Sequence, residues 1–245
     1  MATAALSWRG ALTHPLFAGI REDRADKVLR ELVPRPVRAG RLLNAPGAVP
    51  AYLHLVITGR LQIYRLNSSG HQLVLEIIQA GGIDGILTLA GQSGHFTQAM
   101  TDSLVVSITP RQLQRLREAE PRIGDALLAL SAARLEAREE QMESMAARGV
   151  QGLARLLITL GRTLGHKEGA RLVLEFRLTH QMLADMLGVR RETVAMQLPH
   201  LVRSGVVRVE AGHLTLDPAG LQGFAEPIRR RRTGALVPQM PAALA

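Results

Sequence analysis

Residues 178–207, LTHQMLADMLGVRRETVAMQLPHLVRSGVV, constrain the fold of this 245-residue chain more than any other stretch. Apolar residues recur there at helical spacing on both sides of Gly188, which suits the left-handed end of a helix. Thr179 can cap the first helix with its hydroxyl group. The second helix should begin near Arg191, with an apolar stripe at i, i+4 and i+7 (Val194, Leu198 and Leu201). The pattern predicts a helix-turn-helix, whose second helix reads base edges in the major groove.

Two short β-rich runs, residues 206–209 and 213–216, follow this stretch directly. A small hairpin in this place is typical of the wing of a winged helix. The alternative is an ordinary helical hairpin packed into a core, since short motifs also occur by chance.

The stretch resembles the DNA-binding domain of the Crp/Fnr transcription regulators, whose motif runs LTxQxLAxxLGxxRETVxxxLxxLxxxG. The chain matches this motif at Leu178, Thr179, Gln181, Leu183, Ala184, Leu187, Gly188, Arg191, Glu192, Thr193, Val194, Leu198, Leu201 and Gly205. The resemblance implies base contacts for Arg191 and Glu192, and phosphate contacts for Thr179 and Gln181. It also implies a pseudo-palindromic operator in double-stranded DNA, and RNA polymerase as the enzyme that the bound protein recruits or blocks.

Three residues on the predicted DNA-facing helix depart from the family pattern. Arg190 replaces the usual capping residue, and Met196 replaces a second base-reading arginine. Met196 can touch a thymine methyl group but cannot bond guanine in a bidentate manner. Pro199 removes a helical hydrogen bond, so we expect a kink or a shortened helix there. The target DNA should therefore differ from the usual half-site of the family.

Composition and charge set the class of protein. Hydrophobic residues make up 47% of the chain, which is enough for one large domain or two small ones. The absence of cysteine excludes disulfides and thiolate metal sites. Residues 149–245 carry 13 basic and 7 acidic residues, an excess of six in a total net charge of +9. A basic DNA-binding half fits this excess, although residues 229–232 could equally form a solvated basic tail.

The chain shows no secretory signal and no run of about 20 apolar residues, so we expect a soluble, cytoplasmic protein with no membrane partner. Its eight histidines lack metal-ligand spacing, and no catalytic cluster stands out. We therefore expect neither an enzyme nor a bound cofactor or metal.

The N-terminal half has the texture of an antiparallel β-structure. Short runs with period-two alternation lie at residues 52–58, 61–66, 73–78 and 100–108, and glycine-rich turns separate them. Together with HPLF at residues 14–17, this order resembles the cyclic-nucleotide-binding β-roll of the same family. Nucleotide-binding members have a glutamate in a Phe-Gly-Glu-Leu motif and an arginine near a later serine. This chain has Ile86 in place of the glutamate and no arginine near Ser93, so cAMP and cGMP binding is not expected.

A weaker resemblance is to the cyanobacterial global nitrogen regulator, a 2-oxoglutarate-responsive member of the family. The matching segment begins with Gly85, Ile86 and Leu87. The resemblance assigns effector contacts to His95, Arg134 and Glu139, and implies a small anionic metabolite. The alternative is that these three residues are ordinary solvated surface groups.

Residues 121–147 are predicted to form one long helix, since they contain no proline or glycine after Gly124. Leu128, Leu135 and Met142 lie seven residues apart, a spacing that favours a seam between two helices. A homodimer would also provide the two-fold symmetry that an operator requires. The alternative is a helix that packs only on its own β-roll.

The predicted fold class is α+β. The expected parts are a β-roll sensor domain (residues 1–120), a dimerisation helix (121–148), a winged helix-turn-helix (149–225) and a basic tail (226–245). The predicted function is a sequence-specific, homodimeric transcription regulator of Crp/Fnr type that cAMP does not control. The alternative is a metabolite-binding module, for 2-oxoglutarate or a cyclic nucleotide, whose DNA-reading helix has degenerated.

Overall fold

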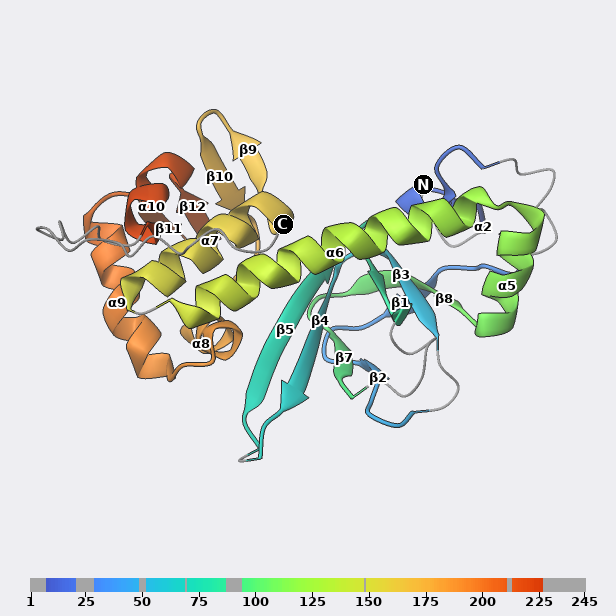
Figure 1. Cartoon of the computed structure of the whole chain (residues 1–245), viewed down its shortest axis with the longest axis horizontal. Helices are drawn as coiled ribbons and strands as arrows, with labels where there is room; N and C mark the ends of the chain where they lie inside the picture. The colour runs from blue at the N-terminus through green and yellow to red at the C-terminus, as the bar shows by residue number, and fades with distance from the viewer. Residues whose placement is uncertain are drawn as a thin grey trace, which may run out of the picture.

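The computed structural model describes residues 8–20, 29–48, 52–68, 70–86, 94–147, 149–210 and 213–226. Leu87, Ser93 and the basic run at residues 229–232 therefore lie outside the described part of the chain. A β-rich body and a mostly helical body lie at opposite ends of the molecule, joined by the long helix α6 (Arg122–Ala146) (Figure 1). This arrangement confirms the predicted α+β fold.

The N-terminal body is a β-roll of two four-stranded antiparallel sheets, with strand orders β1-β8-β3-β6 and β2-β7-β4-β5. The strands are β1 (Arg35–Val37), β2 (Leu42–Asn44), β3 (Leu53–Thr58), β4 (Arg60–Leu66), β5 (Gln72–Gln79), β6 (Ile83–Asp84), β7 (Phe96–Ala99) and β8 (Ser103–Ile108). Buried aliphatic side chains from both sheets, including Val56, Ile63 and Val105, form the core between them. Period-two burial along β4 confirms the alternation in the sequence.

Short helices flank the roll in the sequence and pack against it in one hydrophobic cluster with the start of α6. The helix α2 (Trp8–Ala11) and the 3-10 turn η1 (Pro15–Phe17) precede it, and α5 (Pro110–Ala119) follows it. His14 is buried and joins η1 to the roll, because its Nδ1 accepts from the Leu16 amide and its Nε2 lies 3.0 Å from the Gly82 carbonyl oxygen. Burial lowers the pKa of His14, while the bond to Gly82 opposes this shift.

The C-terminal body contains the two helices and the wing predicted for a winged helix-turn-helix, together with a further helix at either end. It also has a first hairpin, over residues 166–174, that the sequence does not predict. In chain order the elements are α7 (Val150–Leu164), β9 (His166–Glu168), β10 (Arg171–Leu174), α8 (His180–Leu187), α9 (Arg191–Arg203), β11 (Val207–Glu210), β12 (His213–Leu216) and α10 (Pro218–Ala225). The predicted hairpin β11–β12 is confirmed, and it belongs to a sheet of order β11-β12-β10-β9. Strand β9 is exposed and polar throughout, so it carries no alternation that periodicity could detect.

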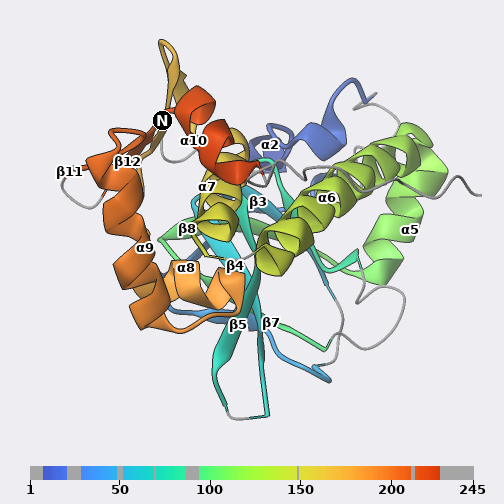
Figure 2. The same ribbon diagram turned by 60° about the vertical axis from the view of Figure 1, so that its left-hand side comes forward.

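The two bodies share one continuous hydrophobic core. Val74 and Ile77 of β5 pack with the buried faces of α7, α8 and α9. Figure 2 shows α8 beside β5, and Gly188 at the end of α8 lies close to Leu73 and Met145. The Gln141 amide on α6 donates to the carbonyl oxygens of Val74 and Met186, at 3.0 and 3.3 Å. The helix-turn-helix is therefore docked on its own sensor body.

Within the described residues, we find no helix that is both long enough and apolar enough to cross a membrane.

Candidate DNA-binding and effector sites

The first helix of the helix-turn-helix has both predicted ends. Thr179 has extended backbone angles, and its hydroxyl accepts from the Met182 amide at 3.1 Å. Gly188 ends α8 in the left-handed conformation, at φ 65° and ψ 30°. Leu183, Ala184, Met186 and Leu187 are buried. The caps and the apolar face read from the sequence are therefore confirmed.

The second helix begins at Arg191, as predicted, and buries Val194, Leu198 and Leu201. Arg190 occupies the N-cap position without a side-chain cap bond, which confirms the loss of a cap there. Helix α9 continues through Pro199 to Arg203, so of the expected kink or shortening, the shortening is wrong and the kink stays a prediction. Pro199 and Ala195 are both exposed, so water can hydrate the carbonyl group that the proline leaves without a helical partner.

The residues expected to meet DNA are all exposed: Thr179, Gln181, Arg190, Arg191, Glu192 and Met196. In Figure 2, α9 runs along one edge of the molecule. The side chains of Arg191 and Glu192 make no hydrogen bond or ion pair with any other described residue, while Gln181 donates to Asp185 at 2.7 Å. Met196 is 68% exposed, which is unusual for a methionine side chain and is typical of a surface that binds a partner.

Three further exposed cations flank this surface, although no motif in the sequence marks them. Arg177 precedes the cap of α8, Arg203 ends α9, and Arg208 lies on the wing strand β11. The signal that could have found them is their position, because basic residues beside a recognition helix commonly contact phosphates.

The candidate effector segment begins with a buried carboxylate. Asp84 of β6 is fully buried, accepts from the Thr97 hydroxyl at 2.6 Å, and lies 3.4 Å from Nε2 of His95 and 3.5 Å from Arg134. Burial alone would raise the pKa of Asp84, but the bonds from His95 and Thr97 and the charge of Arg134 hold that pKa well below its ordinary range. Gly85 follows at φ +98°, where a Cβ atom would collide with the Tyr52 carbonyl group.

The remaining predicted effector residues are only partly brought together. Arg134 donates to Glu76 at 2.7 Å and to the Ile83 carbonyl oxygen at 3.2 Å, while Glu139 is exposed and makes no contact with His95 or Arg134 within the described residues. Ile86 and Arg134 line a cavity of about 180 Å³ against α6. The sequence does not predict the acidic partners of His95 and Arg134, which are Asp84 and Glu76. No pattern in the neighbouring residues distinguishes a buried acid from an exposed one.

No group of three or more His, Asp or Glu side chains in the described ranges is placed to hold a metal ion.

The predicted seam on α6 is mostly exposed in the single chain. Leu128, Leu135 and Met142 are 72%, 60% and 69% exposed. The opposite side of the helix is bound to the roll, with Ile123 fully buried. Large apolar side chains in such a row are typical of a surface that a partner covers.

Two family models match the chain. The model of the Crp-like helix-turn-helix domain matches residues 151–224, and that of the cyclic nucleotide-binding domain matches residues 34–120. Their order and extent agree with the C-terminal body and the β-roll.

Individual relatives agree with both models. A CRP-like cAMP-activated global transcriptional regulator of Mycobacterium tuberculosis is 25% identical over 198 residues, covering 80% of this chain and 88% of the relative. The global nitrogen regulator of Synechococcus elongatus is 23% identical over 188 residues, covering 74% and 85%. The crystal structure of a CRP/FNR-family transcriptional regulator from Thermus thermophilus matches with a TM-score of 0.57 and 26% identity, covering 79% of this chain and 98% of that one. With both domains, their order and the helix-turn-helix residues in agreement, the chain belongs to the Crp/Fnr family of DNA-binding transcription regulators.

Proposed function

We propose that the protein works as a homodimer that binds a pseudo-palindromic operator and recruits or blocks RNA polymerase, without control by cAMP. The observation that carries the dimer is the row of Leu128, Leu135 and Met142 on α6. Seven-residue spacing keeps these side chains on one face, so a second copy of α6 can bury them along a seam. The dimer would then present two recognition helices to half-sites about 34 Å apart.

The surroundings of Asp84 support independence from cyclic nucleotides. A cyclic phosphate needs cations or backbone donors around it. In this chain Arg134 already faces Glu76 and Asp84, and His95 faces Asp84. A phosphate entering this region would also meet the buried charge of Asp84. The Asp84 carboxylate therefore pairs with the cations that a cyclic phosphate would need.

The recognition helix supports a changed target sequence. Arg191 and Glu192 lie in its first turn and are exposed, which supports base reading by both residues. Met196, one turn later, favours a thymine methyl group over guanine. The rival proposal is a metabolite-binding module whose helix no longer reads DNA. Competition for operator DNA at rising salt separates the two, since contacts to phosphates alone lose affinity equally on all sequences.

The seam is tested with Leu135→Glu, and Leu66→Glu serves as a control on an exposed leucine of β4. We expect wild type and the control to be dimers at micromolar concentration by light scattering, and Leu135→Glu to be a monomer. Affinity for a two-half-site operator should fall at least tenfold in the monomer. A wild-type monomer at micromolar concentration with DNA present contradicts the proposal.

Calorimetry with cAMP, cGMP and 2-oxoglutarate tests the sensor. We expect no heat with either cyclic nucleotide and unchanged DNA binding in their presence. Micromolar cAMP binding contradicts the proposal. Binding of 2-oxoglutarate that Arg134→Gln abolishes would support the anionic effector that the resemblance implies.

A further inference from the structure

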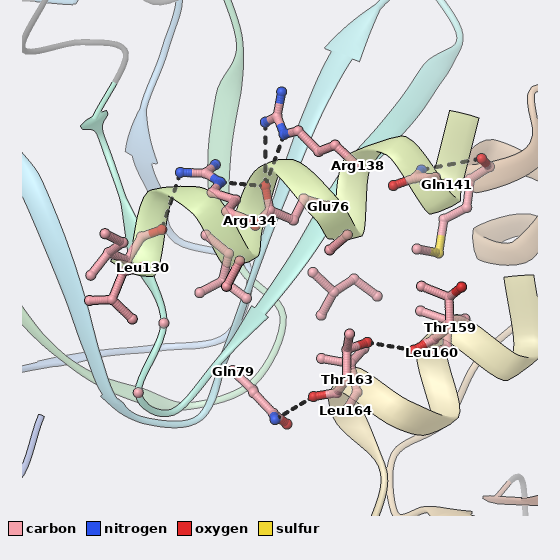
Figure 3. Close-up of a pocket in the computed structure, with 18 of the residues that line it drawn as sticks. Glu76, Gln79, Leu130, Arg134, Arg138, Gln141, Thr159, Leu160, Thr163 and Leu164 are labelled. Atoms are coloured by element: carbon pink, nitrogen blue, oxygen red, sulfur yellow. Dashed lines mark hydrogen bonds and ion pairs between the residues drawn. The ribbon is translucent and has the colours of Figure 1, made fainter. Parts of the chain in front are cut away.

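We propose that the cavity between β5, α6 and α7 binds a small compound that joins a carboxylate group to an apolar body. The cavity has a volume of about 320 Å³ and is drawn in Figure 3. Pockets for small ligands are usually of this size or larger, mostly apolar, with a few polar groups that orient the ligand. This proposal goes beyond the function proposed above, because it concerns a ligand site rather than DNA contacts.

The cavity shares only Arg134 with the residues that the family resemblance assigns to an effector, and most of its lining lies elsewhere. Ile86 and His95 are absent from its lining, whereas Gln79, Leu160 and Met186 belong to it. These three residues come from the roll, from α7 and from the helix-turn-helix. A ligand here would therefore touch the sensor body, the long helix and the DNA-binding body at once.

The walls are suited to an apolar body. Aliphatic side chains face the space from several elements: Ile77, Leu130, Leu156, Leu160, Leu164 and Met186. Two of the α6 residues that border the space, Ala133 and Ala137, are small, so they leave room in the cavity. Because Ala137 is one of these lining residues, a larger side chain at this position would take up part of the space.

The charged end of the cavity has an excess of guanidinium groups. Arg134 and Arg138 both donate to a single oxygen of Glu76, Oε2, at 2.7 Å and 3.3 Å (Figure 3). Arg134 has further acceptors at Ile83 and Asp84. Arg138 uses Nε and Nη2 toward Glu76, and its Nη1 has no acceptor within the described residues. Since the Arg138 side chain is 31% exposed, it can turn to a second carboxylate without leaving a buried charge.

The far side of the cavity is closed by α7. The Gln79 side chain donates to the Thr163 carbonyl oxygen at 2.6 Å, and the Thr159 hydroxyl donates to Glu140 of α6 at 3.0 Å. These bonds join α7 to the roll and to α6 beside the cavity. A ligand that adds contacts across the same gap would stabilise this docked arrangement and so change DNA affinity. Only this last consequence depends on the proposed function.

The test uses the full chain and two probes, 4-phenylbutyrate and octanoate, in isothermal titration calorimetry. Acetate, which lacks an apolar body, and 4-phenylbutanol, which lacks the charge, are the comparison compounds. We expect at least one probe to bind at least tenfold more tightly than both comparison compounds. Ala137→Leu, which narrows the cavity, and Arg138→Gln, which removes one of its two guanidinium groups, should each weaken binding at least tenfold. Arg162→Gln, an exposed arginine of α7 outside the cavity lining, should bind like wild type.

The proposal is overturned if neither probe binds at 5 mM, or if Ala137→Leu and Arg138→Gln bind as wild type while their unfolding temperatures are unchanged. It is also overturned if 4-phenylbutanol binds as tightly as 4-phenylbutyrate. DNA affinity is measured separately, by fluorescence anisotropy with and without the probe. Probe binding with no operator binding would leave the ligand site standing and contradict the regulator proposed above, so the two failures can be told apart.

Discussion

The helix-turn-helix and the sensor roll differ in the exposure and pairing of their polar side chains. On α9, Arg191, Glu192 and Met196 are exposed, and the two charged groups have no partner among the described residues. In the roll, Asp84 and His95 are buried and contact each other. A side chain meant for an outside partner must remain accessible, whereas a buried charge must find its partner inside the protein. The exposed groups on α9 are therefore accessible to an outside partner, whereas the charges around Asp84 are paired within the protein.

The same contrast extends to local stability. The roll gains stability from its internal bonds, while the recognition helix lacks an N-cap bond at Arg190 and loses a helical bond at Pro199. Four substitutions test the contrast, from the largest expected effect to the smallest.

Asp84→Asn should lower the free energy of unfolding by about 3–5 kcal/mol at pH 7, because it leaves Arg134 and His95 facing a neutral group. The pKa of Asp84 is lower in the folded than in the unfolded protein, so its contribution is present above about pH 4 and is lost as pH falls below that value. The gap between wild type and variant in urea unfolding should therefore narrow between about pH 4 and pH 2. The exposed Asp125→Asn is the control, with an effect below about 1 kcal/mol. If both variants lose the same free energy of unfolding, the buried pairing of Asp84 contributes no more to stability than an exposed carboxylate does.

Pro199→Ala should raise the free energy of unfolding by up to about 3 kcal/mol, since it restores the helical bond to the Ala195 carbonyl group. Thermal unfolding measures the effect. Pro218→Ala is the matched control. Pro218 is at the first position of α10, where a backbone amide would have no acceptor within the helix. Equal changes at both positions would speak against a local cost in the recognition helix.

Arg191→Ala should weaken binding to the preferred operator by about 1–3 kcal/mol and relax the preference at one base pair. Binding to a set of single-base operator variants measures both effects. Arg208→Ala on the wing is the control, expected to weaken all sequences alike and to reduce the salt slope by about one. If Arg191→Ala lowers the affinity for all operator variants equally, Arg191 contacts phosphates rather than bases.

Thr179→Ala should lower the free energy of unfolding by about 1 kcal/mol through the lost cap bond to Met182. Thr179→Ser keeps the hydroxyl group and should stay within a few tenths of a kcal/mol of wild type. If alanine and serine behave alike in urea unfolding, the cap contributes nothing measurable.

Much of the helix-turn-helix could be predicted because its signals are local. The Thr179 cap, the left-handed Gly188 and the apolar spacing of Val194, Leu198 and Leu201 each act within one or two helical turns. The β-roll was predictable to the level of its strands, since period-two burial repeats along β4. Strand β9 was missed because its residues His166–Glu168 are polar and exposed on both faces.

The sequence by itself determined the family, the order of the two bodies and the exposed row on α6, because each rests on residues at fixed short spacings. Only the tertiary structure decided which charges meet. Asp84, His95, Arg134 and Glu76 come from β6, the residue before β7, α6 and β5, and up to 58 residues of chain separate two members in contact. The tertiary structure also created the cavity beside Arg138, at the junction of β5, α6, α7 and α8. The periodicity of apolar residues predicts which face of a helix or strand is buried. It does not predict which residue, distant in the sequence, that face will contact.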